Sequence, residues 1–317
     1  MRKLVQIPDS DKLEWKKDFV DRYSKLTDFE LFKKYSLSFL DRSIRVNTLK
    51  ITVADIVVRL KKEWLLEPVP WCKEGFWIEH RGEEKRRDVG NLIEHSLGYI
   101  YVQEAVSMIP PIVLCPKPGE IVLDMCASPG SKTTQIAQYM KNKGVLIAND
   151  FTGDRMKPLG VNIRRCGVTN AVLTLMKGQQ MKLKFDKILV DAPCSGTGTI
   201  RKSLKTLKIW NPYGIKRLAG IQKQLIENAF NILKPGGIMV YSTCSVEPEE
   251  DEGVVSFLLD KYENAKAQDI KLNIKRGKPV TEFAGQAYNK DVSKSLRIWP
   301  QDNNTEGFFV AKIMKLE

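Results

Sequence analysis

Two cysteines directly follow predicted strands, a position at which a thiol could take part in catalysis. Cys194 closes the segment Asp191-Ala-Pro-Cys194, and Cys244 closes Ser242-Thr-Cys244; each follows an apolar run typical of a buried strand. A thiolate can act as the nucleophile of covalent catalysis, whereas free cysteines are commonly inert core residues. Because Pro, Gly and Ser surround both positions, we favour reactive thiols in one crevice and keep inert core residues as the alternative.

The other cysteines suggest no metal site. Cys72, Cys115, Cys126 and Cys166 are widely spaced, no C-x-x-C occurs, and the chain has only 2 histidines. A zinc site or a disulfide framework is therefore not expected. We expect reduced thiols in a cytoplasmic protein, no metal, and a small packing role for Cys126.

A loop that begins at the end of the apolar run 121–126 has the residue types of a ligand-binding loop. Residues 124–133 read Asp-Met-Cys-Ala-Ser-Pro-Gly-Ser-Lys-Thr, which is neither G-x-G-x-x-G nor a P-loop. Its small residues let backbone approach a ligand, and Lys132 stands at a helix N-terminus, where an anionic group would lie. Asp150, about 20 residues further on, can accept two hydrogen bonds from a ribose diol. A helix cap or turn residue is the alternative for Asp150.

From about residue 118 the chain alternates short apolar runs with amphipathic stretches. Such alternation predicts an α/β fold, a parallel sheet with helices on both faces, in which ligands collect beyond the carboxyl ends of the strands. The last apolar run, 307–316, is expected as an antiparallel strand at the edge. The other predicted strands are 121–126, 144–150, 171–176, 187–193 and 236–245, with clear helices at 131–140 and 215–233.

The first hundred residues differ in pattern and predict a small α+β domain. Helices are expected at 13–25, at 28–35 with Asp28 as N-cap, and at 53–63, with a strand at 43–49. We therefore divide the chain into residues 1–100 and 101–317, packed against each other.

The charge balance favours a polyanionic partner. Lys and Arg number 51 against 38 Asp and Glu, a formal charge of +13. Residues 155–185 and 201–223 each hold seven basic residues and no acid, and the second run includes Trp210 and Tyr213. Such runs suit an RNA backbone with unstacked bases, and solvated helix faces are the alternative. The N-terminus has no apolar signal segment and no run reaches 18 apolar residues, so neither a signal peptide nor a membrane span is expected.

The motifs together resemble those of the Sun/Fmu family of RNA cytosine-5 methyltransferases, close to its archaeal tRNA enzymes. The similarity covers roughly residues 43–315 and rests on DMCASPGSKTTQ, IAND, DAPCSGTGTIRK and YSTCSVEPEEDE, with RVNTLK and RIWPQDNNTEGFF at either end. It implies a Rossmann-like class I methyltransferase fold and S-adenosylmethionine as cofactor. The cofactor contacts that it implies are Cys126, Ala127, Ser128, Pro129, Gly130, Ser131, Lys132, Asp150, Arg155 and Asp191.

The resemblance also implies the catalytic roles. Cys244 would attack C6 of cytosine, Cys194 would assist product release, and Asp191 with Lys132 would complete the catalytic set. The N-terminal residues Arg45, Asn47 and Lys50 would contact RNA. Two departures from the family pattern are the absence of an acid in 176–180, near the adenine, and Gln301 where many members have His.

The substrate expected from this resemblance is tRNA, bound by a monomer. Ribosomal RNA is the alternative substrate, and a non-catalytic RNA-binding assembly factor is the alternative class of protein. DNA cytosine methylation is disfavoured by the paired Pro-Cys and Thr-Cys arrangement, and N-methylation by the absence of DPPY or NPPF.

Overall fold

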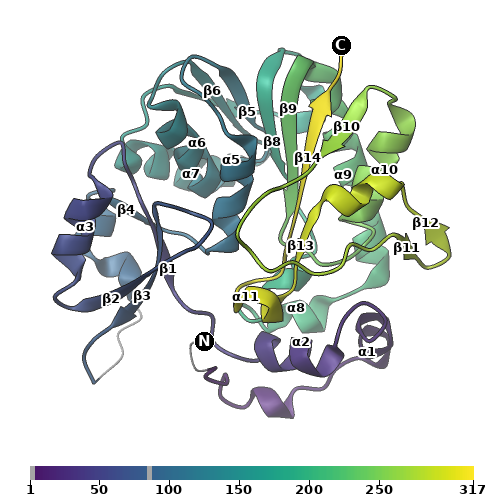
Figure 1. Cartoon of the computed structure of the whole chain (residues 1–317), viewed down its shortest axis with the longest axis horizontal. Helices are drawn as coiled ribbons and strands as arrows, with labels where there is room; N and C mark the ends of the chain where they lie inside the picture. The colour runs from purple at the N-terminus through teal and green to yellow at the C-terminus, as the bar shows by residue number, and fades with distance from the viewer. Residues whose placement is uncertain (1–3, 84–87) are drawn as a thin grey trace.

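The computed structural model describes residues 4–83 and 88–317. Its centre is a mixed sheet in the order β10-β14-β9-β8-β5-β6-β7, in which β5 to β9 are parallel to one another and β14 is antiparallel to β9. The predicted class I methyltransferase sheet is thus confirmed (Figure 1). Its strands are β5 (Ile121–Asp124), β6 (Val145–Asp150), β7 (Ala171–Leu175), β8 (Phe185–Asp191), β9 (Leu233–Thr243), β10 (Ala265–Gln268), β13 (Leu296–Ile298) and β14 (Phe308–Lys315).

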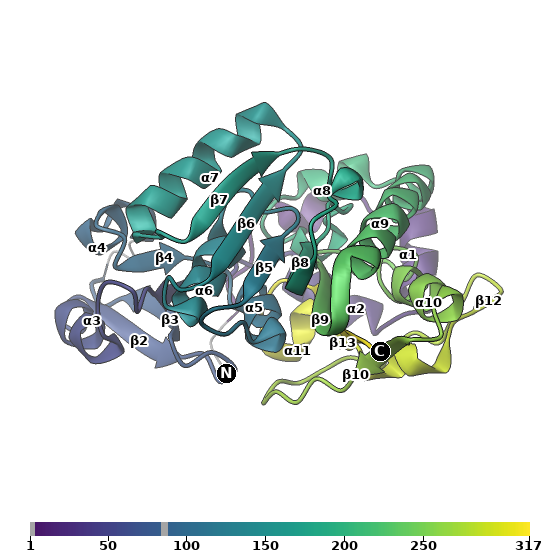
Figure 2. The same ribbon diagram turned by 90° about the horizontal axis from the view of Figure 1, so that it is seen from above.

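Helices cover both faces of this sheet because neighbouring residues of each strand point to opposite sides. Leu189 of β8 packs on the side of α5, α6 and α7, whereas Ile188 and Val190 pack on the side of α9 and α10. Figure 2 shows the two helical layers from above. The helices of this part are α5 (Ile109–Leu114), α6 (Ser131–Met140), α7 (Gly153–Cys166), α8 (Lys205–Ile209), α9 (Pro212–Ile232), α10 (Glu252–Lys261) and α11 (Pro300–Asn303).

The last long strand departs from the sequence prediction. β14 is antiparallel, as expected, but it is not an edge strand, because β10 pairs with it from Ala265↔Lys315 to Gln268↔Lys312. β13 pairs with the beginning of β14 as well. Since β10 is short and polar (Ala-Lys-Ala-Gln), its sequence carries no strand pattern, and only the pairing with β14 defines it.

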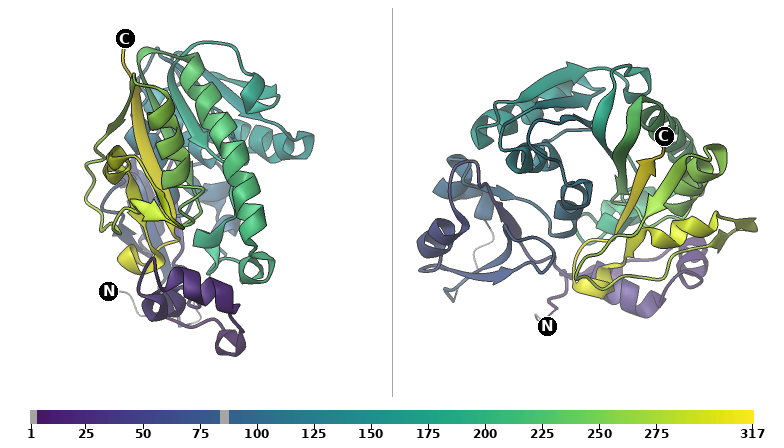
Figure 3. Two further views of the ribbon diagram at one scale, coloured as in Figure 1. Left: turned by 90° about the vertical axis from the view of Figure 1, so that its right-hand side faces the viewer. Right: turned by 45° about the horizontal axis from the view of Figure 1, so that its top comes forward.

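The residues before the main sheet form two separate packing units (Figure 3). One unit is a small antiparallel sheet in the order β2-β3-β1-β4, whose core includes Ile44, Ile56 and Trp64. Its elements are β1 (Ser43–Val46), α3 (Val53–Leu60), β2 (Trp64–Pro68), β3 (Gly75–His80), α4 (Ile93–Ser96) and β4 (Ile100–Val102).

The second unit, α1 (Lys17–Tyr23) and α2 (Phe29–Ser36), packs against the main domain. Asp28 caps α2 as predicted, since its side chain accepts a hydrogen bond from the Leu31 N–H at 3.0 Å. Phe19 and Tyr23 lie in one apolar cluster with Trp210 and Val246. The N-terminal helices therefore support the segment that follows Cys244, rather than the small sheet.

Short elements complete the described fold. They are the β11–β12 hairpin (Glu282–Phe283 and Gln286–Ala287) and the 3-10 helices η1 (Ser10–Lys12), η2 (Val89–Asn91), η3 (Val106–Met108), η4 (Gly178–Gln180), η5 (Thr197–Thr199) and η6 (Lys290–Lys294).

Candidate active site

The two cysteines of interest meet at the carboxyl ends of neighbouring strands. β8 and β9 pair in parallel with Asp191 opposite Ser242, so the segments after both strands leave the sheet at the same place. The Cys194 and Cys244 sulfurs lie 3.1 Å apart, within hydrogen-bond distance. A separation of fifty residues in the chain thus becomes a direct contact between two thiols.

The thiols are not equivalent. The hydrogen bond with Cys244 raises the pKa of Cys194 well above its ordinary value, and burial raises it further. Either sulfur can act as the donor, so the contact joins the two thiols without assigning the proton to one of them. A raised pKa leaves less of Cys194 as the thiolate, which is the nucleophilic form of cysteine.

Glu250 joins the two cysteine segments. Its carboxylate accepts hydrogen bonds from the Ser195 N–H at 2.9 Å, the Ser195 hydroxyl, the Ser245 hydroxyl at 2.6 Å and the Gln222 amide at 3.0 Å. The residue is buried, and burial raises its pKa. Ser195 and Ser245 each directly follow a site cysteine, so this one side chain fixes both segments. Sequence reasoning missed Glu250, which stood unassigned within the motif YSTCSVEPEEDE.

A glycine contact fixes the backbone of Cys244. The Gly198 N–H donates to the Cys244 carbonyl at 3.0 Å, and the Gly307 N–H donates to the Gly198 carbonyl at 2.8 Å. A Cβ on Gly198 would lie 2.2 Å from the Gly307 carbonyl oxygen. Only glycine allows this approach of η5 to β14.

An ion pair stands beside the thiols. The Lys132 ammonium lies 2.7 Å from one Asp191 oxygen, and the Ser242 hydroxyl donates to the other at 2.8 Å. Burial by itself would lower the pKa of Lys132, but the Asp191 carboxylate outweighs burial and the pKa is raised, with a further contribution from Cys244. Lys132 also donates to the Ser107 hydroxyl at 3.0 Å and faces the Phe308 ring. The site thus presents a fixed cation, a fixed carboxylate and two thiols.

The loop expected to hold the cofactor folds back on Asp150. The Ser128 N–H donates to the Asp150 carboxylate at 3.2 Å, and the Arg155 guanidinium lies 3.5 Å from the same oxygen. Arg155 also donates to the Ser128 carbonyl at 2.9 Å. Gly130 has a φ of 106°, which leads the loop into α6 with the first N–H groups of that helix directed at the loop.

The residues present fit a bound S-adenosylmethionine. Asp124, at the end of β5, is buried, and its Oδ1 has no hydrogen-bond partner among the described residues, so it is an acceptor left for a ligand. Burial raises the pKa of Asp124 to about 7, and the Asp191 and Asp150 carboxylates add to the shift. Burial also raises the pKa of Cys126, which is consistent with an unreactive small residue beside the loop.

Comparisons with known proteins identify the family. The family model described as 16S rRNA methyltransferase RsmB/F matches residues 111–314, and the model described as the N-terminal domain of 16S rRNA methyltransferase RsmF matches residues 16–105. The chain belongs to the RsmB/F family of RNA methyltransferases. This is the Sun/Fmu family that the motifs predicted, so S-adenosylmethionine is the cofactor of the domain.

Two relatives of this chain are named for different RNA substrates. The tRNA (cytosine(49)-C(5))-methyltransferase of Pyrococcus abyssi is 50% identical over 305 residues, 94% of this chain and 96% of that protein. Ribosomal RNA small subunit methyltransferase F of Vibrio atlanticus is 46% identical over 285 residues, 87% of this chain but 58% of that protein. The chain thus spans little more than half of the Vibrio enzyme.

Solved structures agree with the fold. A methyltransferase homologue from Pyrococcus horikoshii has a TM-score of 0.84 at 39% identity, covering 98% of this chain and 100% of that one. NSun6 from Pyrococcus horikoshii, solved with the S-adenosylmethionine analogue SFG, has a TM-score of 0.81 at 26% identity, covering 95% and 98%.

Residues of the small sheet that were expected to contact RNA serve instead to join the parts of this methyltransferase. Arg45 is fully buried and donates to Gln103 and to the Ser131 carbonyl, each at 2.8 Å. Asn47, also buried, donates to the Gly98 and Cys166 carbonyls, and Lys50 donates to two further carbonyls. The RNA prediction for Arg45 and Asn47 is wrong, because internal acceptors occupy their donors.

Two members of the basic run 201–223 are likewise unavailable to RNA. Trp210 is buried and its indole N–H donates to Glu247 at 2.9 Å. Arg201 is buried and donates to backbone carbonyls of Phe39 and Thr305 at 2.8 and 3.0 Å. Lys202, Lys205, Lys208 and Tyr213 remain exposed. The run is therefore part structural anchor and part exposed cationic face.

The two positions that depart from the family pattern make defined local contacts. In the acid-free segment 176–180, the Asn228 amide fixes the Gly178 carbonyl at 2.7 Å, and a Cβ on Gly178 would collide with Met125 and Leu225. Gln301 donates to the Thr27 hydroxyl at 2.9 Å, which links α11 to the N-terminal helices. Within residues 4–83 and 88–317 no group of His, Cys, Asp and Glu could hold a metal, and no helix is long and apolar enough to cross a membrane.

Proposed function

We propose that this methyltransferase transfers a methyl group to C5 of cytosine in tRNA through a covalent adduct between Cys244 and C6. The observation that carries the chemistry is the contact of two thiols at 3.1 Å beside the Lys132–Asp191 ion pair. A scaffold without activity would have no use for two thiols in contact beside an ion pair.

The covalent step removes the main chemical obstacle. Cytosine C5 is a poor nucleophile, and addition of the Cys244 thiolate to C6 forms a carbon–sulfur bond that gives C5 enamine character. Negative charge develops over N3 and O2, and the Lys132–Asp191 pair supplies the proton or hydrogen bond that stabilises it. When bound, S-adenosylmethionine supplies an electrophilic methyl group on a sulfonium.

Release completes the cycle. A base takes the C5 proton, the C5–H electron pair restores the C5–C6 double bond, and the Cys244 sulfur leaves as its thiolate, which gives 5-methylcytosine. The contact of Cys194 with the Cys244 sulfur supports a role for Cys194 in this release. Asp150, Arg155 and the loop Cys126–Lys132 are the proposed cofactor contacts, with Asp150 as the acceptor for the ribose hydroxyls.

The tRNA assignment rests on coverage as well as identity. The tRNA enzyme of Pyrococcus abyssi matches this chain over 96% of its own length, whereas the Vibrio ribosomal RNA enzyme matches over 58% of its length. Ribosomal RNA is the second candidate, because identity to the Vibrio enzyme is nearly as high, at 46%.

Transfer of tritium from labelled S-adenosylmethionine to unmodified tRNA and to small-subunit ribosomal RNA tests the proposal, followed by bisulfite sequencing of the product. We expect label in tRNA at cytosines that resist bisulfite. Label in ribosomal RNA alone would transfer the assignment to the second candidate. Labelled RNA without protected cytosines would overturn the C5 chemistry.

A further inference from the structure

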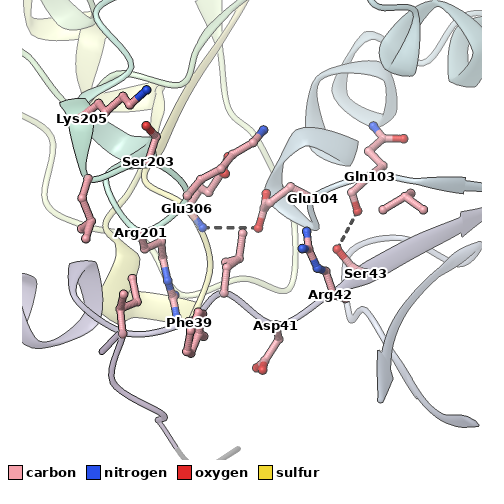
Figure 4. A pocket seen from close by; sticks show the side chains of 15 residues that line it. Phe39, Asp41, Arg42, Ser43, Gln103, Glu104, Arg201, Ser203, Lys205 and Glu306 are labelled. Carbon is pink, nitrogen blue, oxygen red and sulfur yellow. Dashed lines mark hydrogen bonds between the residues drawn. The ribbon is translucent and has the colours of Figure 1, made fainter. Parts of the chain in front are cut away.

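A pocket of about 570 Å³ lies between the small sheet and the segment that follows Cys194. One side is formed by residues entering β1 and leaving β4, among them Phe39, Arg42 and Glu104; the other side is formed by 201–205 and Glu306. Figure 4 shows Glu104 and Glu306 approaching each other from these two sides. None of the residues assigned to the catalytic set lines this pocket.

Glu306 supplies an unused acceptor in the pocket. It is 5% exposed, and its Oε1 has no hydrogen-bond partner among the described residues. Glu104, in contrast, is occupied: its carboxylate accepts from the Val106 N–H at 2.7 Å, from the Ser107 N–H at 3.2 Å and from the Glu306 N–H at 3.4 Å. A buried carboxylate oxygen without a partner is costly unless a ligand satisfies it.

The pocket adjoins the catalytic centre through short connections. Glu306 precedes Gly307, which is hydrogen-bonded to Gly198 and through it to the Cys244 carbonyl. On the other side, Glu104 holds the Ser107 backbone, and the Ser107 hydroxyl accepts from Lys132. A nucleotide bound here would therefore be close to the base that reacts with Cys244.

The remaining lining suits a nucleotide. Phe39, 37% exposed, and Leu204 offer an apolar wall, and Arg42, Lys202 and Lys205 offer cations for a phosphate. The carboxylates of Glu104 and Glu306 disfavour an anionic group beside them and favour a base edge that donates hydrogen bonds. The three cations can bind the phosphate of the same nucleotide.

Building on the proposed function, we propose that this pocket binds a guanine that flanks the target cytosine in the RNA strand, with Glu306 accepting hydrogen bonds from its N1–H and N2–H. Guanine has two adjacent donors on its Watson–Crick edge, whereas adenine, cytosine and uracil each pair a donor with an acceptor there. Glu306 is thus a specificity residue for sequence context, outside the methyl-transfer machinery.

The test uses RNA transcripts carrying a cytosine shown to be methylated by the wild-type enzyme, with each base in turn on its 5′ and 3′ sides. At one of the two positions guanine should be favoured over adenine by about tenfold or more in kcat/KM, since a bidentate base contact gives roughly 5- to 150-fold discrimination. Inosine, which lacks the 2-amino group, should lie between them.

The variant Glu306→Gln should lose about tenfold in kcat/KM on the guanine transcript and raise adenine relative to guanine, because an amide offers one donor and one acceptor. Asp41→Asn removes a charge from the same pocket and should keep the guanine preference. Thermal unfolding checks that both variants fold.

Each outcome separates this inference from the proposed function. Methylation indifferent to both flanking bases would overturn the guanine site while leaving cytosine methylation intact. An equal loss on every transcript for Glu306→Gln would also overturn it, because Glu306 would then act on the target base or on the fold. Absence of 5-methylcytosine with every wild-type transcript would instead contradict the proposed function.

Discussion

At the scale of single residues, the proposed chemistry requires different roles for two cysteines, Cys194 and Cys244, that have the same side chain. Both follow strands and both are partly buried, but Cys194 is surrounded by groups that keep its proton, the nearest being the Cys244 sulfur. Lys132 forms an ion pair with Asp191 at 2.7 Å beside the two thiols. Because both side chains are thiols, we expect their surroundings rather than their residue type to separate the proposed roles.

Substitution of each cysteine separates the roles. Cys244→Ala should abolish methylation and form no adduct with RNA, because the attacking sulfur is gone. Cys194→Ala should still attack and methylate but release slowly, so a protein–RNA complex resistant to denaturing electrophoresis should accumulate. The double variant should show no complex. A trapped complex with Cys244→Ala and a dead Cys194→Ala would reverse the assignment.

A second residue-scale prediction concerns pH. The pKa of Asp124 is about 7 in the folded protein against an ordinary value of 3.8, because burial disfavours its charge. The folded state therefore binds this proton more tightly than the unfolded chain, and the stabilisation present below pH 4 is lost as pH rises through 7. Asp124→Asn, which stays neutral, should gain stability relative to wild type between pH 4 and pH 8.

Urea unfolding of both proteins across that range measures the difference. The isosteric amide keeps an oxygen for the Thr133 hydroxyl, which donates to Asp124 at 2.7 Å, so packing is preserved. A gap between the two proteins that does not change with pH would contradict a raised pKa at Asp124.

At the scale of elements, the site is a junction of strand ends rather than a property of any one strand. β5 ends at Asp124, β6 at Asp150, β8 at Asp191 and β9 at Thr243, and their parallel order brings all four ends to one edge. Glu250, in the turn before α10, then joins the two cysteine segments through Ser195 and Ser245. Loss of the Glu250 carboxylate should therefore disturb both cysteine segments at once.

Glu250→Gln should impair methyl transfer without weakening cofactor binding. The amide leaves the Ser195 or Gln222 N–H without an acceptor in a buried site, which costs roughly 1–3 kcal/mol of stability and loosens the two cysteine segments. We expect kcat to fall by about tenfold or more, with an unchanged affinity for S-adenosylmethionine by calorimetry.

The neighbouring variant Glu249→Gln is the matched control, since the Glu249 carboxylate pairs with Arg22 of α1. Equal kinetic losses in both variants would contradict a special role of Glu250. A loss of S-adenosylmethionine affinity in Glu250→Gln alone would contradict the prediction, because Glu250 would then act on the cofactor rather than on the cysteine segments.

At the scale of the whole molecule, the basic residues fall into two groups, buried arginines that join distant segments and exposed lysines on the surface. Buried arginines join distant parts: Arg45 links β1 to α6, and Arg201 links the segment after Cys194 to the chain before β1. Burial lowers the pKa of both, as expected where several neutral acceptors surround a desolvated guanidinium. We expect exposed lysines such as Lys202, Lys205 and Lys208 to contact phosphates instead.

Replacing Lys202, Lys205 and Lys208 together by Gln should flatten the salt dependence of RNA binding. Each lost phosphate contact changes the slope of log K against log salt by about 0.7–0.9, so three contacts account for about 2–3. Filter binding of tRNA over a range of potassium chloride concentrations gives the slope.

A triple variant at Lys266, Lys271 and Lys278, which are exposed elsewhere, makes the same change in net charge. It should keep a slope close to wild type. If the two triple variants behave alike, the segment 202–208 makes no particular contact with phosphate.

The sequence alone determined the local parts of this protein. Hydrophobic runs and turn residues located β5 to β9 and α9, and the Asp28 cap began α2, because these signals depend on neighbours within a few residues. The motifs around Cys194, Cys244 and Lys132 indicated the family, since their residue types carry the chemistry.

Only the tertiary structure decided which residues share a surface. The sequence suggested RNA contacts for Arg45, Asn47, Arg201 and Trp210. In the structure all four are buried and donate hydrogen bonds to carbonyl or carboxylate groups of distant segments. β14 became an inner strand through its pairing with the polar β10, and Glu250 gained its role from two segments fifty residues apart. Residue type fixes what a side chain can donate or accept, whereas long-range packing fixes which partner it meets.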